Sequence, residues 1–249
     1  MIENSMFAKN KQGKSALVFA MQYPVTSAVE LAARAGFDAI HLDGEHGAFN
    51  PVAVDDIVAI AHAFNMSVTA RVPNINANEI NRWLDRGLQG IMGPHIENAE
   101  EAQALADACL FPPDGWRSWG GGRGTEHGDL DVIEGTYGGK LGFAQFANAN
   151  MLVGGQIESK EAAAHADEII AVPGLMAIAW GPHDMAASLG HPGEPDHPEV
   201  LAIHDEVEAK VRAAGKHLWS DYGATLDMKA LLIGAGREFA SEHGNDTFS

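Results

Sequence analysis

Two acidic residues, Glu158 and Asp184, each follow an apolar run that is typical of a buried strand. The runs are Met-Leu-Val-Gly-Gly-Gln-Ile before Glu158 and Met-Ala-Ile-Ala-Trp-Gly-Pro-His before Asp184. Parallel α/β proteins place their active sites at the carboxyl ends of their strands, so two carboxylates in these positions can share a divalent metal ion. The stretch between them has room for one helix, and residues 160–171 repeat apolar side chains at helical spacing.

The two carboxylates offer hard oxygen ligands but are too few to enclose an ion. Water and substrate would therefore complete the coordination of Mg²⁺ or Mn²⁺. Gln156 shares the strand face of Glu158 and could hold a metal-bound water or the substrate. The alternative for either acid alone is helix capping, because each stands at the start of a helical pattern.

A second group of polar residues ends the strand-like run at 39–43. Asp43, Glu45 and His46 follow one another within His-Leu-Asp-Gly-Glu-His-Gly. An aspartate that accepts a hydrogen bond from one imidazole nitrogen leaves the other free to take a proton, so we expect Asp43 to orient His46 as a general base. In the alternative, Asp43 or Glu45 caps the next helix and His46 is a solvated loop residue.

Arg71 ends the apolar run Val-Thr-Ala-Arg and should point its guanidinium into the mouth of the fold. A fixed cation there can stabilise an enolate oxygen. A structural ion pair with an acid at the mouth is the alternative, and the two roles are compatible.

The segment Trp180-Gly181-Pro182-His183 supplies further predicted substrate contacts beside Asp184. Backbone N–H groups that open a helix can receive a substrate carboxylate. Trp180 indicates an apolar or aromatic-tolerant pocket, with packing as its alternative role.

Short strand-like runs alternate with helical segments along the whole chain, which predicts one domain, residues 1–249, of (β/α)8 TIM-barrel type. The predicted strands are 16–21, 39–43, 67–72, 90–94, 152–158, 177–182, 217–220 and 238–242. The predicted helices are 27–35, 53–64, 78–86, 99–110, 160–171, 200–214 and 226–235. With the eighth strand at 238–242, the eighth outer helix is expected to be absent or truncated.

Residues 111–150 are rich in proline and glycine and are predicted to be a long loop over the active-site end. The run Gly120-Gly121-Gly122 lacks the flanking strand and helix that a phosphate cradle requires. Trp116, Trp119 and Arg123 are instead predicted to form a lid or a subunit contact at the substrate entrance.

Composition excludes several classes of protein. With 249 residues, 46% hydrophobic and 20% charged, the chain is typical of a globular protein, and it has no apolar run long enough to span a membrane. Its formal charge of −18 disfavours binding to nucleic acid. The polar segment 1–14 lacks the apolar core of a secretion signal, so a cytoplasmic location is expected. The single cysteine, Cys109, is predicted to be a small buried hydrophobe.

Taken together and in this order, these motifs resemble those of the HpcH/HpaI class II pyruvate aldolases, whose members cleave 4-hydroxy-2-oxo acids. The resemblance covers nearly the whole chain. Its landmarks are Ala35-Gly36-Phe37-Asp38, Leu42-Asp43-Gly44-Glu45-His46, Arg71-Val72-Pro73, Phe111-Pro112-Pro113, Gln156-Ile157-Glu158-Ser159, Gly181-Pro182-His183-Asp184-Met185 and Ser188-Leu189-Gly190.

The resemblance implies a role for each matching residue. Glu158 and Asp184 would hold the metal with Gln156 beside it, and Arg71 would steady the pyruvate enolate. His46 with Asp43 would handle the proton of the aldol hydroxyl. Asp85 matches a position that reaches the site of a neighbouring subunit. The family forms homo-oligomers, dimers or trimers of dimers, that exchange the eighth helix between barrels, and the missing eighth helix departs from this pattern.

The expected activity is therefore a retro-aldol cleavage, or its reverse, that depends on Mg²⁺, Mn²⁺ or Co²⁺ and yields pyruvate or a close analogue plus an aldehyde. The expected partners are these small molecules and other copies of the chain, with no nucleic acid and no membrane. Two alternatives stay open. One is a lyase of the same superfamily that acts on a CoA thioester of the malyl-CoA or citramalyl-CoA type, and the other is a keto-acid-binding barrel without activity.

Overall fold

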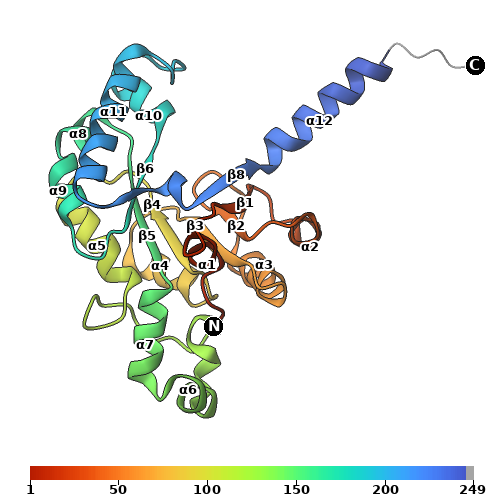
Figure 1. Ribbon diagram of the computed structural model, residues 1–249, viewed down its shortest axis with the longest axis vertical. Helices are drawn as coiled ribbons and strands as arrows, with labels where there is room; N and C mark the ends of the chain where they lie inside the picture. Colours follow the sequence, from red (N-terminus) through yellow and green to blue (C-terminus); the bar gives the residue numbers. More distant parts are fainter. Residues whose placement is uncertain (245–249) are drawn as a thin grey trace, which may run out of the picture.

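Eight parallel strands form one curled sheet at the centre of the molecule (Figure 1). The structure is a computed structural model and describes residues 1–244. The order of strands across the sheet is β7-β6-β5-β4-β3-β2-β1-β8. Their bounds are β1 (Ala16–Met21), β2 (Ala39–Asp43), β3 (Ser67–Arg71), β4 (Gly90–Gly93), β5 (Leu152–Ile157), β6 (Ala177–Trp180), β7 (His217–Leu218) and β8 (Gly223–Asp227).

The first seven predicted strands are confirmed. Two have the predicted bounds, and the next five end one or two residues earlier than predicted. Successive side chains along each strand point to opposite faces of the sheet. On β2, Ile40 and Leu42 are fully buried in the main apolar core, whereas His41 and Asp43 line a cavity inside the curl.

Parallel strands need crossover connections, and helices supply them on the outer face of the sheet. Asparagine and serine side chains cap several of these helices: Asn50 caps α3, Asn76 caps α4, Asn98 caps α5 and Ser159 caps α8. The helices that connect the strands are α2 (Thr26–Ala35), α3 (Pro51–Ala63), α4 (Ala77–Leu84), α5 (Ala99–Cys109), α8 (Lys160–Ala164), α9 (Ala166–Ala171), α10 (Pro182–Ser188) and α11 (Pro198–Ala213). A further helix, α1 (Ser5–Asn10), precedes β1.

The prediction for residues 111–150 is wrong in two respects. The segment contains α6 (Leu130–Tyr137) and α7 (Lys140–Ala149), and it lies at the amino ends of the strands, below the sheet in Figure 1. The reason is topological, because α5 returns the chain to that end and β5 must start there. Hydrogen bonds confirm the placement: Leu152 N–H, at the start of β5, donates to Gln89 O just before β4.

The end of the chain also differs from the prediction. The eighth strand is β8, which pairs with β1 from Ala16 opposite Gly223, and the predicted strand 238–242 lies inside a helix, α12 (Met228–His243). An eighth helix is thus present, and it projects away from the sheet (Figure 1). The prediction of the eighth strand failed because the short run Gly-Ala-Thr-Leu-Asp is typical of a loop, whereas Phe239 and Ala240 are typical of a strand. The sequence pattern also predicted that the chain ends a few residues after its eighth strand. The last residues of that prediction, 245–249, lie outside the described residues.

A turn of 3-10 helix, η2 (Trp219–Asp221), separates β7 from β8 and lies against β6 and β8. Trp219 reaches into the curl where Gly154 leaves space, since a Cβ at that glycine would lie 2.5 Å from the indole. No helix among residues 1–244 combines the length and the apolar character needed to cross a bilayer.

Candidate active site

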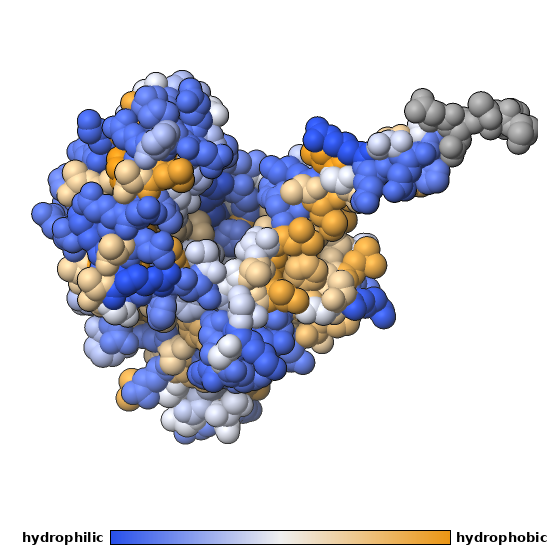
Figure 2. Space-filling view, turned by 45° about the horizontal axis from the view of Figure 1, so that its top comes forward, coloured by the Kyte–Doolittle hydropathy of each residue, from blue (hydrophilic) through white to orange (hydrophobic). Residues whose placement is uncertain are grey.

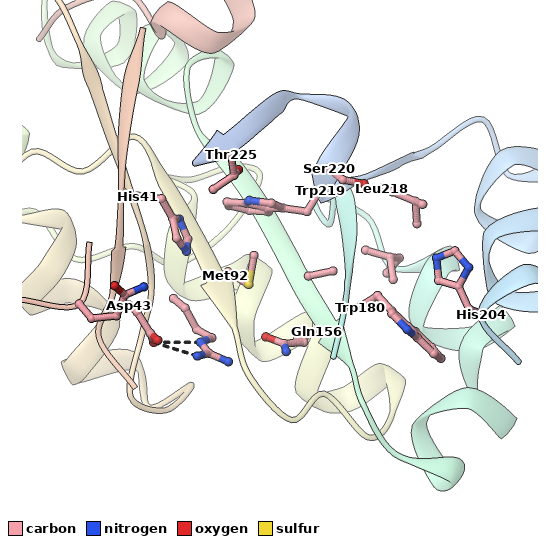
Figure 3. Close-up of a pocket in the computed structure, with 14 residues that line it drawn as sticks. His41, Asp43, Met92, Gln156, Trp180, His204, Leu218, Trp219, Ser220 and Thr225 are labelled. Atoms are coloured by element: carbon pink, nitrogen blue, oxygen red, sulfur yellow. Dashed lines mark hydrogen bonds and ion pairs between the residues drawn. The ribbon is translucent and has the colours of Figure 1, made fainter. Parts of the chain in front are cut away.

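A cavity of about 360 Å³ opens at the carboxyl ends of the strands (Figure 3). Four of the predicted site residues line it: Asp43, Arg71, Gln156 and Trp180. Figure 3 shows Asp43 and Trp180 on opposite sides, with Gln156 between them. The remaining lining residues are Gln22, His41, Met92, Ile178, Ala179, His204, Leu218, Trp219, Ser220 and Thr225.

Among the described residues that line this cavity, Arg71 is the only arginine or lysine. Its Nε and Nη2 donate to Asp43 Oδ1 at 3.1 and 2.9 Å, and its Nη1 lies 3.0 Å from Glu45 Oε2. The two carboxylates hold the guanidinium in one orientation, since Asp43 and Arg71 are register partners at the ends of β2 and β3. Arg71 therefore forms the ion pairs that were considered as its alternative role. These ion pairs hold its guanidinium in the lining of the cavity.

The structure does not reproduce the expected contact between Asp43 and the His46 ring. Asp43 Oδ1 accepts from the backbone N–H of His46 at 3.2 Å, and the carboxylate nearest to the ring is Glu45, 3.7 Å from Nε2. The tight turn at Gly44 causes this, because it turns the His46 backbone rather than its imidazole toward Asp43. Burial raises the pKa of Asp43, but the His46 N–H and the Arg71 charge outweigh it and hold that pKa below its usual value.

Among the described residues, Glu158 is the only buried aspartate or glutamate, with 2% of its surface exposed. Gln156 Nε2 donates to its Oε2 at 2.6 Å, and the backbone N–H of His95 donates to its Oε1 at 2.7 Å. Burial raises the pKa of Glu158, and the nearby charges of Asp184 and Glu45 add to this effect. A buried carboxylate with a raised pKa at a strand end is typical of a functional site.

Gly181 lies against the buried carboxylate, and a Cβ there would stand 2.4 Å from Glu158 Oε2. Pro182 begins α10, and both His183 and Asp184 are exposed in its first turn. The structure thus brings Asp184 within electrostatic reach of Glu158 and leaves it open to solvent. The substrate contacts assigned to Gly181, Pro182 and His183 stay predictions.

Sequence reasoning missed two histidines at the site. His95 lies two residues after β4 and contacts both Glu45 and Glu158 through its ring. His41 lies inside the curl, with Nδ1 2.8 Å from Thr69 Oγ1 and its ring edge-on to Trp219. Burial lowers the pKa of His41 to about 4, so it is neutral at physiological pH. The signal for both was their position in or just after a predicted strand.

Comparison with known proteins agrees with this geometry. The sequence model described as HpcH/HpaI aldolase/citrate lyase matches residues 21–247. The chain belongs to the HpcH/HpaI family. It is 31% identical to a pyruvate aldolase of Rhizobium etli over 86% of this chain and 80% of that protein. It is 33% identical to a 4-hydroxy-2-oxovalerate aldolase of Rhodococcus jostii over 86% and 79% of the two chains.

A solved structure shows the same fold. The crystal structure of an HpcH/HpaI aldolase from Desulfitobacterium hafniense superposes with a TM-score of 0.84, at 25% identity, and covers 97% of both chains. The protein is accordingly a lyase of the HpcH/HpaI family with a parallel, curled α/β fold.

The predicted lid is wrong for the chain's own site, since none of its three residues lines the cavity. Trp119 packs against Phe111 and Phe143, Trp116 is exposed, and Arg123 lies 3.7 Å from Asp55. All three belong to the segment at the opposite end of the sheet. A subunit contact, the other role considered for them, stays a prediction.

Asp85, the C-cap of α4, lies at that same end. Gly120 and Gly122 pack so closely on it that a Cβ at either would lie within 2.4 Å of an Asp85 oxygen. Burial raises the pKa of its carboxyl group, against the opposing charges of Arg117 and Arg86. The predicted contact of Asp85 with a neighbouring site in this HpcH/HpaI protein stays a prediction.

The residues around Glu158 fit a divalent metal ion. The donors are hard carboxylate and amide oxygens, which suit Mg²⁺ and Mn²⁺. Among the described residues, the buried Oε1 of Gln156 has no hydrogen-bond partner. A buried acceptor without a donor is costly, and a hydrated cation or a substrate group can satisfy it.

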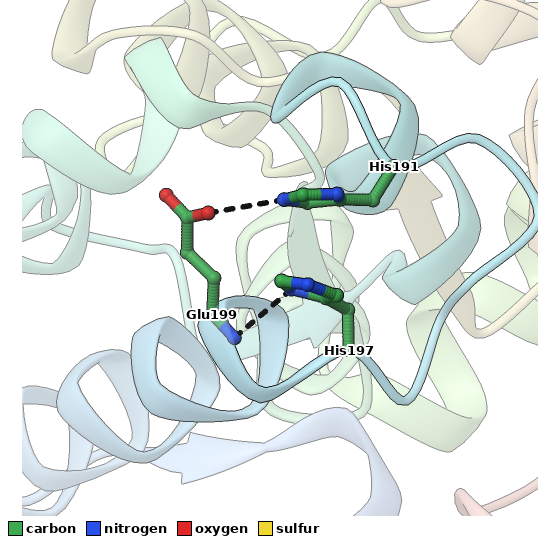
Figure 4. A group of neighbouring side chains, drawn as sticks. All are labelled: His191, His197 and Glu199. Atoms are coloured by element: carbon green, nitrogen blue, oxygen red, sulfur yellow. Dashed lines mark hydrogen bonds and ion pairs between the residues drawn. The ribbon is translucent and has the colours of Figure 1, made fainter.

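A second group of possible ligands, His191, His197 and Glu199, lies at the start of α11 (Figure 4). The two rings stack with centroids 3.6 Å apart and planes only 17° from parallel. Because an imidazole binds a metal in its own ring plane, stacked rings cannot share one ion without rotating. His197 Nδ1 accepts from Glu199 N–H and caps α11, so a capping role accounts for this group.

Proposed function

We propose that this protein is a divalent-metal-dependent aldolase that cleaves, or forms, 4-hydroxy-2-oxo acids. The products of cleavage would be pyruvate, or a close analogue, and an aldehyde. The observation that carries the proposal is the cavity in which a single guanidinium, held by two carboxylates, faces Gln156 and the adjoining Glu158. The names of the pyruvate aldolase and 4-hydroxy-2-oxovalerate aldolase relatives support the substrate class.

Glu158 and Asp184 would hold the metal ion, Mg²⁺, Mn²⁺ or Co²⁺, with Gln156 beside it. When bound, such an ion supplies Lewis-acid stabilisation of negative charge on a 2-oxo acid. Gln156 and the His95 N–H fix the Glu158 carboxylate before any ligand arrives. A ligand set fixed in this way need not reorganise during the reaction.

Arg71 would stabilise the negative charge that develops on the C2 oxygen as the C3–C4 bond breaks. Its guanidinium has five donors in a fixed plane, and Asp43 and Glu45 set the direction of that plane. Partial burial strengthens its effect, since only 17% of the side chain is exposed.

His46 would take the proton of the C4 hydroxyl during cleavage and return it during synthesis. Its side chain is 65% exposed and the ring nitrogen Nε2 lies 3.7 Å from Glu45. Glu45, rather than the predicted Asp43, is therefore the carboxylate beside this ring, at a distance too long for a hydrogen bond. An exposed ring at the mouth can reach a substrate that enters from solvent.

The aldehyde portion would lie on the far side of the cavity, against Trp180, His204 and Trp219. Trp180 and His204 meet edge to face with centroids 5.2 Å apart, and Ile178 and Leu218 add apolar surface. This side carries no charged residue among those that line the cavity, so it favours an uncharged or aromatic aldehyde.

No lysine is among the described residues that line the cavity, and Schiff-base aldolases require one. The proposed chemistry uses the metal site in its place. A CoA-thioester substrate would bring several phosphate groups, and Arg71 alone of the lining residues could pair with them. The geometry therefore favours the smaller 4-hydroxy-2-oxo acid.

The protein is further proposed to be a (β/α)8 barrel that assembles as a homo-oligomer, based on dimers. The helix α12 projects from the sheet and exposes Leu231, Leu232, Ile233 and Phe239, each to at least 42%. Figure 2 shows apolar side chains on α12 and on the surface below it. Apolar surface of this extent is typical of an interface, and exchange of α12 between two copies would bury it.

Pyruvate release from a 4-hydroxy-2-oxo acid, followed with a coupled dehydrogenase, tests the proposal. Activity should vanish with EDTA and return with Mg²⁺, Mn²⁺ or Co²⁺, and Glu158→Ala should abolish it. Activity that survives EDTA and is trapped by borohydride would contradict the metal-dependent mechanism. Turnover of malyl-CoA or citramalyl-CoA in place of the free acids would favour the thioester lyase, and no turnover of either class would favour a binding protein.

A further inference from the structure

The imidazole of His95 lies between two carboxylates at the edge of the proposed metal site. Its Nδ1 is 2.9 Å from Glu158 Oε1, and its Nε2 is 3.0 Å from Glu45 Oε1. The backbone N–H of the same residue donates to Glu158 Oε1 at 2.7 Å. Both the ring and the backbone of His95 are thus directed at one oxygen of the buried acid.

The backbone of His95 adopts an uncommon conformation to do this. Its φ is 51°, in the left-handed region, where a residue with a Cβ is disfavoured by about 1 kcal/mol. The neighbouring Ile96 N–H donates to Gln156 O at 3.1 Å, which ties this turn to β5. Uncommon backbone geometry that the surrounding structure maintains is often associated with function.

The contacts of the ring place Nδ1 where a metal ligand atom would lie. A ring protonated at both nitrogens would donate to Glu45 and Glu158, whereas a ring protonated at Nε2 alone turns the lone pair of Nδ1 toward the proposed metal site. The distance of 2.9 Å between Nδ1 and Glu158 Oε1 suits two ligands of one ion, since neighbouring ligand atoms about 2.1 Å from one metal lie roughly 3 Å apart.

We propose that His95 Nδ1 is a nitrogen ligand of the divalent ion that Glu158 and Asp184 hold, an inference that rests on the proposed function. Glu45 orients the ring by accepting from Nε2–H, as carboxylates do for metal-binding histidines in many proteins. A nitrogen donor also changes which ion is preferred. Imidazole suits transition metals, whereas Mg²⁺ binds oxygen ligands, so the site selects Mn²⁺ or Co²⁺ over Mg²⁺.

Pulsed EPR of the Mn²⁺-loaded full-length protein tests this directly, because it detects the ¹⁴N nucleus of an imidazole bound to the ion. The wild type should show this coupling, and His95→Asn should lose it. Asparagine tolerates the left-handed backbone and keeps the N–H that donates to Glu158. His95→Gly, which accepts this backbone without strain, serves as the second variant if the first does not fold.

His191→Asn is the matched control, since it removes a histidine from the group at α11 and should leave the coupling unchanged. Titration calorimetry adds a second readout: His95→Asn should weaken Mn²⁺ binding roughly tenfold or more, and Mg²⁺ binding by less. Coupling that persists in His95→Asn, or that disappears in His191→Asn, would overturn the assignment.

The result also separates this inference from the proposed function. A wild type that binds Mn²⁺ and releases pyruvate, but shows no imidazole nitrogen on the ion, contradicts the His95 ligand alone. A wild type that shows the coupling without any metal-dependent pyruvate release contradicts the aldolase proposal and leaves His95 as a metal ligand.

Discussion

Asp43 and Arg71 stand opposite each other at the ends of β2 and β3, and Arg71 donates two N–H groups to a single oxygen of Asp43, at 3.1 and 2.9 Å. The pair turns a flexible side chain into a fixed cation in the lining of the cavity. Glu45 contacts the third guanidinium nitrogen, so the cation is constrained from two sides. This arrangement leads to the first prediction.

Arg71→Lys should lower kcat by roughly 10²–10³, because an ammonium keeps the charge but loses the planar donors that Asp43 and Glu45 orient. The coupled pyruvate assay measures the loss. Arg82→Lys is the matched control, since Arg82 is an exposed arginine paired with Glu79, and its kcat should not change. An Arg71→Lys enzyme with wild-type kcat would show that the guanidinium does not stabilise the developing charge.

Gly181→Ala should weaken metal binding and activity without unfolding the protein. The new Cβ would lie 2.4 Å from Glu158 Oε2 and 2.5 Å from Glu158 Cβ, so the buried carboxylate must move. We expect at least a tenfold rise in the Kd for Mn²⁺, within the range of roughly 10- to 100-fold seen when the support of a metal ligand is lost.

The matched control for this glycine is Gly135→Ala in α6. No atom lies within 4 Å of a Cβ built at Gly135, and alanine is the better helix former. Gly135→Ala should leave metal binding unchanged and the melting temperature equal or slightly higher. Equal Kd values for the two variants would refute the proposed role of Gly181 in holding Glu158.

His41 should make the protein less stable as the pH falls from about 6.5 toward 4. Burial lowers its pKa in the folded state to about 4, whereas the unfolded chain keeps the ordinary value of 6.5. Between these values the unfolded state binds more protons, so the free energy of unfolding decreases with decreasing pH.

Urea denaturation at pH 7.5 and pH 5 measures this effect. His41→Gln should reduce the loss of stability between the two pH values by roughly 1–2 kcal/mol. His62, whose pKa burial also lowers to about 4, should account for part of the remaining loss. The control His183→Gln changes an exposed histidine, and its free energy of unfolding should keep the wild-type pH dependence. If the free energy of unfolding of His41→Gln also keeps that pH dependence, His41 is not the group responsible.

Replacing Leu232 and Phe239 together by glutamate should reduce the mass of the particle in solution. These residues are seven apart on α12, share one helix face and are each 65% exposed. If another copy covers this face, two buried charges would disrupt the assembly. Light scattering coupled to size exclusion gives the mass, and Lys229→Glu on the same helix is the control. An unchanged mass in the double variant would mean that α12 does not hold the copies together.

The sequence alone determined seven strands, most of the helices between them, though not α6, α7 or α10, and the strand-end positions of Asp43, Arg71, Gln156 and Glu158. These features follow from local patterns, since apolar runs, caps and glycines act over a few residues. The resemblance to HpcH/HpaI aldolases likewise rested on motifs, and the family comparison confirmed it.

Contacts between distant segments were decided only by the tertiary structure. Gly223–Asp227 becomes a strand because β1 offers it an edge, and its short, weakly apolar run did not reveal this. The segment 111–150 lies far from the mouth because α5 ends at the other side of the sheet. Asp43 orients Arg71 rather than the His46 ring, and His95 meets Glu45 and Glu158, because strand register and a left-handed turn bring those atoms within 3 Å or so.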